Sequence, residues 1–206
     1  MSLFMFCKII SIILAVIGIS MLLPVGTALI CHEYAMLPAF LLPLCASLLL
    51  AAVFLLVKRR ERLNLSVRAV FLLVASVWLA ICFFGMIPLL AGDYFPSFTD
   101  AFFETVSGFS TTGASVLSDV ESLPRSLNLW RCEMHWLGGM GVIALTVALL
   151  PLLGVGGFQL IKAESTGVDK GKITPKITTT AKTLWILYIS FTAAQTIALR
   201  IAGMDF

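Results

Sequence analysis

The chain has 206 residues, of which 60% are hydrophobic and 12% are charged, and its mean hydropathy is +1.04. This composition lies far outside the range of soluble globular domains and predicts an integral membrane protein. The net charge of +3 is not gathered in a basic run interleaved with aromatic residues, which argues against nucleic-acid binding. The five cysteines include no close pair, so neither a disulfide framework nor a zinc site is predicted.

Five stretches without a charged residue are candidates for membrane-spanning helices. A hydrocarbon core about 30 Å thick requires about 20 helical residues, so the first four stretches are long enough and the fifth is at the lower limit. In chain order they are 9–31, 34–57, 69–92, 136–161 and 183–199.

The first two stretches are predicted to form an antiparallel hairpin, because only the short segment 31–33 separates them. Pro24, Pro38 and Pro43 predict kinks in these helices. The first stretch is too long for the apolar region of a signal peptide and lacks a small-residue cleavage pattern. It is therefore expected to remain as an uncleaved helix.

The distribution of charge predicts the orientation. With a cytoplasmic N-terminus, eleven of the 14 basic residues lie inside: Lys8, five within 58–68 and five within 162–182. The positive-inside rule favours this topology. Eight of the 11 acidic residues fall outside, and we interpret them as a cation-attracting vestibule, with an ordinary solvated loop as the alternative. They are Glu33, Asp93, Asp100, Glu104, Asp119, Glu121, Glu133 and Asp205.

Segment 93–130 interrupts the spans with a short helix, predicted over 99–108. Ser97 or Thr99 can cap its N-terminus. Ten helical residues cover about 15 Å, roughly half the bilayer. The C-terminus of the helix therefore ends near the bilayer centre, where its partial negative charge favours a cation.

A hydroxyl-rich return loop follows this helix, with the sequence Ser-Thr-Thr-Gly-Ala at 110–114. Irregular backbone at this depth requires burial in protein or a water-filled cavity, and carbonyls directed at an ion are the layout of a selective pore loop. Gly113 can adopt positive φ, whereas Thr111 and Thr112 are expected to be extended. A phosphate-binding loop and an ordinary extracellular loop are the less favoured alternatives, the former because the Gly-Lys-Ser/Thr ending is missing.

The fourth span is preceded by a mixture of aromatic and charged residues at 129–136, typical of a membrane interface. We interpret His135 as an interfacial hydrogen-bonding group rather than a ligand or proton relay. Gly138, Gly139 and Gly141 thin the helix for close packing against the pore helix. The Lys-rich segment 162–182 is expected to be cytoplasmic, as a partner contact or a solvated loop.

As a set, the motifs of this chain resemble the TrkH-type membrane subunits of bacterial potassium uptake systems. The resemblance implies two leading helices and then four helix–pore loop–helix repeats around one pore, with potassium on filter carbonyls from each repeat. The motifs are Asp-Ala-Phe-Phe-Glu at 100–104, Ser-Gly-Phe-Ser-Thr-Thr-Gly-Ala at 107–114, Trp-Arg at 130–131, Trp-Leu-Gly-Gly-Met-Gly at 136–141, Leu-Pro-Leu-Leu-Gly-Val-Gly-Gly at 150–157, Ala-Glu at 163–164 and Pro175.

By this resemblance Thr111, Thr112 and Gly113 supply one quarter of the filter, with K⁺ at Thr111 and Thr112 and with Ser110 and Ala114 flanking. Ser110 stands where the family usually has Thr. The resemblance also implies a bacterial plasma (inner) membrane protein that is not an enzyme and needs no cofactor, K⁺ being the transported ion. A cytosolic, nucleotide-binding TrkA-like subunit is the implied partner, besides the lipid bilayer.

The predicted fold class is an all-α membrane protein with an incomplete set of repeats. We expect a leading transmembrane hairpin (1–62), a first helix–pore loop–helix repeat (63–162), and a cytoplasmic loop with the first helix of a second repeat (163–206). Family members are more than twice this long, and one pore loop cannot surround an ion. Conduction therefore requires the missing repeats or other copies; the alternative is a non-conducting or regulatory membrane protein with a vestigial pore loop.

The topology is testable by cysteine labelling in a background without the five native cysteines. We expect Ser118→Cys to react with an impermeant maleimide on intact cells, because residue 118 lies on the outer side of the predicted topology. Lys170→Cys is the matched control, which should react only after permeabilisation. The reverse pattern of the two sites would contradict the orientation.

Overall fold

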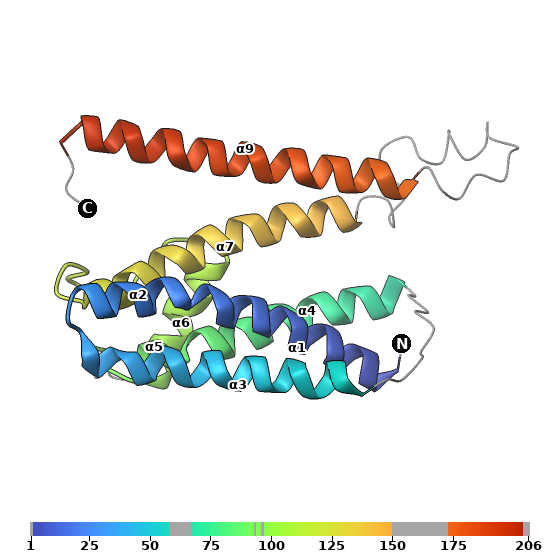
Figure 1. Ribbon diagram of the computed structural model, residues 1–206, viewed down its shortest axis with the longest axis horizontal. Coiled ribbons are helices and arrows are strands. Elements are labelled where there is room, and N and C mark those ends of the chain that lie inside the picture. The colour runs from blue at the N-terminus through green and yellow to red at the C-terminus, as the bar shows by residue number, and fades with distance from the viewer. Residues whose placement is uncertain (1, 58–66, 93, 96, 150–172, 204–206) are drawn as a thin grey trace, which may run out of the picture. The chain divides into compact units, whose positions relative to one another are not determined.

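The computed structural model describes residues 2–57, 67–92, 94–95, 97–149 and 173–203. In these ranges all regular structure is helical, which confirms the predicted all-α class (Figure 1). The expected boundaries at 62/63 and 162/163 lie outside the described residues. The helices are α1 (Leu3–Ser20), α2 (Leu22–Ile30), the short 3₁₀ helix η1 (Tyr34–Met36), α3 (Leu37–Leu56), α4 (Val67–Gly85), α5 (Ile87–Leu90), α6 (Phe98–Phe109), α7 (Arg125–Leu149) and α9 (Ile173–Ile201).

The chain divides into two compact units, residues 1–138 and 139–206. Helix α7 begins in the first unit and ends in the second. Within the second unit, α7 and α9 meet at Gly139, where an added Cβ would lie 2.6 Å from the Tyr188 hydroxyl oxygen. The filter candidates, residues 110–114, belong to the first unit, as do Ser107, Glu104 and Arg131.

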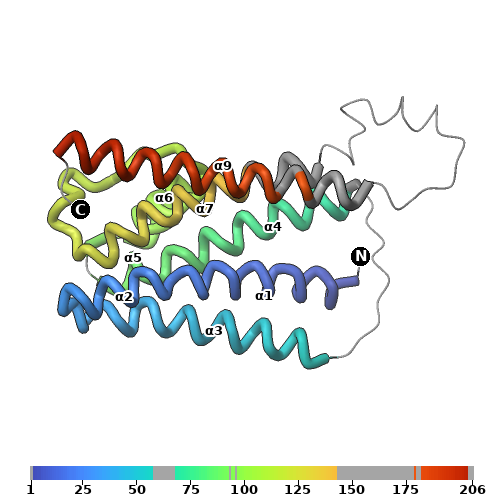
Figure 2. The backbone as a smooth tube through the Cα atoms, turned by 45° about the horizontal axis from the view of Figure 1, so that its top comes forward, coloured from blue at the N-terminus to red at the C-terminus, as the bar shows by residue number. Residues whose placement is uncertain are grey.

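Helices α1, α2 and α3 form the predicted leading hairpin (Figure 2). Helix α1 ends at Ser20 and α2 begins at Leu22, as the kink expected near Pro24 requires. Proline has no N–H with which to bond the carbonyl four residues earlier, here that of Ser20. Helices α1 and α3 approach closely at Gly18, where a Cβ would overlap the Ser47 hydroxyl.

Within the described ranges, four segments are long and apolar enough to cross a membrane: Leu3–Ile30, Tyr34–Leu56, Arg68–Leu90 and Lys182–Ile201. They correspond to the first, second, third and fifth predicted spans. The predicted fourth span, 136–161, continues beyond the described residues, and α7 covers its first part.

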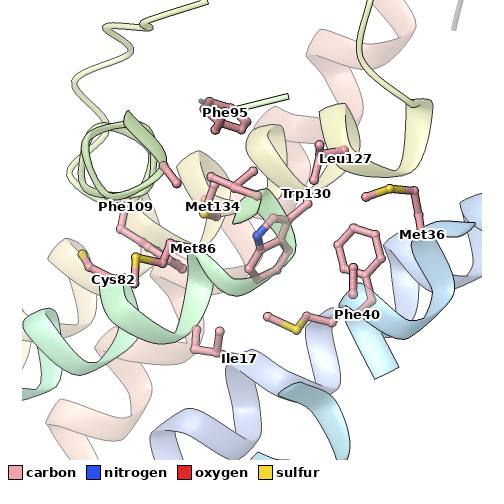
Figure 3. Close-up of a cluster of buried hydrophobic side chains, with 14 of the residues drawn as sticks. Ile17, Met36, Phe40, Cys82, Met86, Phe95, Phe109, Leu127, Trp130 and Met134 are labelled. Atoms are coloured by element: carbon pink, nitrogen blue, oxygen red, sulfur yellow. The ribbon is translucent and has the colours of Figure 1, made fainter. Parts of the chain in front are cut away.

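A single buried cluster joins the leading hairpin to the helices around the return loop (Figure 3). Trp130 of α7 is fully buried within it and donates its indole N–H to the Gly85 carbonyl of α4, at 2.9 Å. Phe40 of α3 and Ile17 of α1 belong to the same cluster. The hairpin therefore supports the helices that carry the candidate site.

Helix α7 packs directly on the backbone of α6 at Gly138. A Cβ at this position would overlap the Phe109 carbonyl oxygen and lie 2.9 Å from the Phe109 Cα. This confirms, for Gly138, the predicted close packing of the glycine-rich end of α7 on the pore helix. Glycine is needed here because no rotamer change can move a backbone neighbour away.

We expect Gly138→Ala to lower the free energy of unfolding by about 1–3 kcal/mol, since the two helices must separate. Gly26→Ala is the control: nothing lies within 4 Å of its Cβ, and alanine favours a helix by up to about 1 kcal/mol. Thermal unfolding in detergent measures both, and an equal or higher stability for Gly138→Ala would contradict the close approach.

Candidate pore-loop site

Helix α6 begins with a side-chain cap that the sequence predicts. The Ser97 hydroxyl accepts a hydrogen bond from the Asp100 backbone N–H at 3.1 Å and donates one to the Asp100 carboxylate at 2.8 Å. Ser97 rather than Thr99 is therefore the cap. The helix has 12 residues, one more at each end than expected, and spans about 18 Å, too short to cross a bilayer.

The last turn of α6 is enclosed by α4 and α7. An added Cβ at Gly85 of α4 would lie 2.6 Å from the Phe109 ring, and one at Gly108 would lie 3.1 Å from the Cβ of Met134 in α7. The ring of Phe109 meets that of Trp130 edge-on, with centroids 6.4 Å apart. Contacts this close fix where the helix stops, and hence where the return loop begins.

Helix α6 ends in a left-handed turn at Thr111, whose φ is 59°. The N–H of Thr112 bonds the Ser107 carbonyl at 3.0 Å, and that of Thr111 bonds the Gly108 carbonyl at 2.9 Å. This is the Schellman pairing, which satisfies the last carbonyls of a helix and requires positive φ at the residue after the cap. The expectation of an extended Thr111 is therefore wrong: helix termination overrides its β-branched preference, at a cost of about 1–2 kcal/mol.

Side-chain hydroxyls around this turn form hydrogen bonds with one another and with the loop backbone. The hydroxyls of Ser110 and Thr112 lie 2.8 Å apart, and the Ser107 hydroxyl donates to the Ala114 carbonyl at 2.6 Å. Gly113 has φ of 78°, which confirms the predicted positive angle, and its added Cβ would meet nothing within 4 Å. Among the described residues, none donates a hydrogen bond to the carbonyl oxygens of residues 111–113.

Beyond Ala114 the loop is attached to the carboxylate of Glu104, one turn before Ser107 on α6. Glu104 accepts hydrogen bonds from the Ser115 hydroxyl at 3.0 Å and the Val116 N–H at 3.2 Å. It is also paired with Arg131 of α7, whose Nε lies 2.7 Å away and whose Nη2 makes a second contact. The side chain of Glu104 is only 2% exposed.

Three members of the predicted acidic vestibule are hydrogen-bonded to other parts of the protein or buried, so they are not free charges of a solvated outer loop. Glu104 is paired as described. Glu33 accepts the N–H groups of Arg125, at 2.7 Å, and Ser126, at 3.0 Å, and so caps α7 from the tip of the hairpin. Glu133 is buried, and its Oε2 has no partner among the described residues.

The pairing of Glu104 with Arg131 is the part of the site that sequence analysis missed. Residues 101, 104, 105 and 108 occupy one face of a helix, and three of them are small, which marks a buried face. A carboxylate on such a face requires a cationic partner. The sequence therefore indicates that Glu104 needs a cationic partner. Which residue this is, Arg131 at 27 residues' distance, depends on how α7 packs and does not follow from the sequence. His135 bonds the Arg131 carbonyl at 2.8 Å, in line with its predicted hydrogen-bonding role.

Comparison with known proteins shows the family of this chain. The family model described as "Cation transport protein" TrkH matches residues 37–204. The chain belongs to the TrkH family. It is 40% identical over 200 residues to the Trk system potassium uptake protein TrkH of Vibrio parahaemolyticus, covering 96% of this chain and 41% of that protein. It is 45% identical over 150 residues to the Escherichia coli K12 protein of the same name, covering 71% and 31%.

The crystal structure of the potassium transporter TrkH from Vibrio parahaemolyticus has the same fold, with a TM-score of 0.80 and 35% identity. The match covers all of this chain and 41% of that one. The chain thus spans less than half the length of the TrkH proteins it matches. Family membership confirms the predicted resemblance, and the family is described as one of cation transport proteins.

We expect Arg131→Met to destabilise the chain by about 3–5 kcal/mol, because it leaves the Glu104 carboxylate buried without a cation. The double variant Glu104→Gln/Arg131→Met should recover much of this loss, since the unpaired charge is gone. Thermal unfolding in detergent provides the measurement.

Arg125→Met serves as the control, because its side chain lies at the exposed start of α7. If Arg131→Met and Arg125→Met unfold alike, the buried pair does not hold α7 to α6.

Proposed function

We propose that this chain is the N-terminal part of a potassium uptake subunit and contributes one pore loop to a cation-selective filter. The observation that carries the proposal is the row of three carbonyls, Thr111 to Gly113, which accept no hydrogen bond from any described residue and follow the end of a helix of half-span length. A backbone carbonyl that has no protein donor needs water or an ion. Filters select ions with such carbonyls.

The electrostatics of the site favour a cation over an anion. The C-terminus of α6 carries the partial negative charge of the helix dipole next to the return loop. The carbonyl oxygens add further partial negative charge, and residues 110–116 are exposed in this chain. The Arg131 guanidinium is neutralised by Glu104 and buried behind the loop, so it does not oppose a cation at the front.

The proposed ligands are the carbonyls of Thr111, Thr112 and Gly113, with K⁺ at the first two. Ser110 and Ala114 flank them, since Ser110 caps α6 and the Ala114 carbonyl accepts the Ser107 hydroxyl. One loop offers ligands from one side only, so the other sides come from further repeats or other copies. The length of the matched relatives supports further repeats.

The remaining sequence predictions stay part of this proposal. They are a place in the bacterial inner membrane with the N-terminus in the cytoplasm, a first helix–pore loop–helix repeat within 63–162, and a cytosolic TrkA-like partner. Of the Lys-rich segment 162–182 that would meet such a partner, residues 162–172 lie outside the described residues, and 173–182 form the start of helix α9 rather than the expected loop.

The filter is testable in a chimera in which residues 1–206 replace the matching 41% of the Vibrio parahaemolyticus relative. Gly113→Asp should abolish or strongly reduce potassium uptake, because φ of 78° is strained for any residue with a Cβ. Uptake in a potassium-transport-deficient bacterium is the measurement, with membrane content followed by immunoblot.

Thr112→Ser is the matched control and should retain uptake, since it keeps both the carbonyl and the hydroxyl that bonds Ser110. The open space around Gly113 means that the variant should insert normally. Normal uptake and selectivity with Asp at position 113 would favour the alternative of a vestigial, non-conducting loop.

A further inference from the structure

We propose that Glu104 is a positioning residue for ion selectivity: held by Arg131, it fixes the outer end of the return loop and thereby sets the placement of the filter carbonyls. This inference rests on the proposed function of residues 111–113. It assigns a role to a buried ion pair that makes no contact with the ion itself.

The register between α6 and the return loop supports this role. Ser107 bonds the Ala114 carbonyl, and Glu104, one turn earlier, bonds Ser115 and Val116. Three helical residues rise about 4.5 Å, and one to two residues of extended chain cover about 3.3–6.6 Å. The rise between Glu104 and Ser107 on the helix therefore matches the distance between their partners on the loop. The loop runs back along α6 and is attached to two successive turns of it.

The candidate filter lies between two attachments. The inner one is the helix-terminating pair of hydrogen bonds from Thr111 and Thr112, and the outer one is formed by Ser107 and Glu104. Between them the carbonyls of 111–113 are unbonded within the described structure, and the space beside Gly113 is open. The positions of those carbonyls consequently depend on where the two attachments hold the chain.

Arg131 makes the outer attachment rigid. Its guanidinium contacts Glu104 twice, lies 3.4 Å from the Ser115 hydroxyl oxygen, and is itself held by the Asn128 side-chain oxygen at 3.2 Å. Ser115 in turn accepts the Leu117 N–H at 3.1 Å. Because Arg131 of α7 binds the Glu104 carboxylate on one side, the carboxylate is held in a single orientation. In that orientation its remaining lone pairs face the hydrogen-bond donors of the loop.

A substitution at Ser115 can distinguish a positioning role of the ion pair from simple stabilisation of the fold. It is exposed, and its replacement by alanine removes one donor to Glu104 while leaving the Glu104–Arg131 pair intact. A pair that only stabilises the fold would be indifferent to this change. A pair that positions the loop would lose part of its hold on it.

The experiment uses the same chimera and compares Ser115→Ala, Ser115→Thr and Ser122→Ala. Ser122 is a matched control because its hydroxyl bonds the Asp119 carbonyl within the outer loop, away from Glu104. We expect Ser115→Ala to lower the K⁺ over Na⁺ preference of uptake about tenfold. The free energy of one hydrogen bond to a charged group corresponds to a rate factor of at least this size, which sets the scale of the expected loss. Ser115→Thr keeps the hydroxyl and should retain the preference, and Ser122→Ala should match the parent.

Glu104→Gln provides a second, independent readout on the 206-residue chain in detergent. Hydrogen exchange of the amides at 111–117 should accelerate, while that of the α6 amides at 102–108 should stay slow. Should this variant fail to fold, the Ser115 series alone decides the proposal.

Unchanged selectivity in Ser115→Ala, in a chimera where Gly113→Asp abolishes uptake, would overturn the positioning role and leave the proposed filter standing. Uptake that falls only in proportion to the amount of protein, with its preference intact, would also overturn it. Insensitivity to both Gly113→Asp and Ser115→Ala would instead remove the filter assignment itself.

Discussion

The arrangement of the first unit depends on one buried carboxylate. A charge as enclosed as that of Glu104 is tolerated only when it is paired and its remaining lone pairs are satisfied. Arg131 supplies the charge, and Ser115 and Val116 supply the further donors. Helix α6, the return loop that follows it and helix α7 are thereby brought to a common point.

Small residues make this pairing geometrically available. Gly85, Gly108 and Gly138 let α4 and α7 approach α6 to backbone contact around its last turn. Helices that touch at glycine gain dispersion and lose little side-chain entropy, which suits packing in a bilayer where no water is expelled. Trp130 then joins this assembly to the leading hairpin, because its ring lies in the buried cluster and its N–H reaches the Gly85 carbonyl.

Features fixed by local chemistry were predictable from the sequence, and those fixed by packing were not. The Ser97 cap, the short α6, the break before Pro24 and the positive φ at Gly113 each follow from a few neighbouring residues. The burial of Glu104 follows from where α7 lies, and counting acidic residues on the outer side could not show it. Intrinsic preference alone does not predict the positive φ of Thr111, because the hydrogen bonds that a helix end must satisfy decide it.

Side chains and backbone have different roles in the return loop. The hydroxyls of Ser107, Ser110 and Thr112 are used to shape the loop, by bonding Ala114 or one another, while the carbonyls of 111–113 stay unbonded within the described structure. The contact of Ser110 with Thr112 needs only a hydroxyl group, so either serine or threonine could make it at position 110. Thr111 takes an unfavourable φ because the helix end on one side and the Glu104 attachment on the other hold it there.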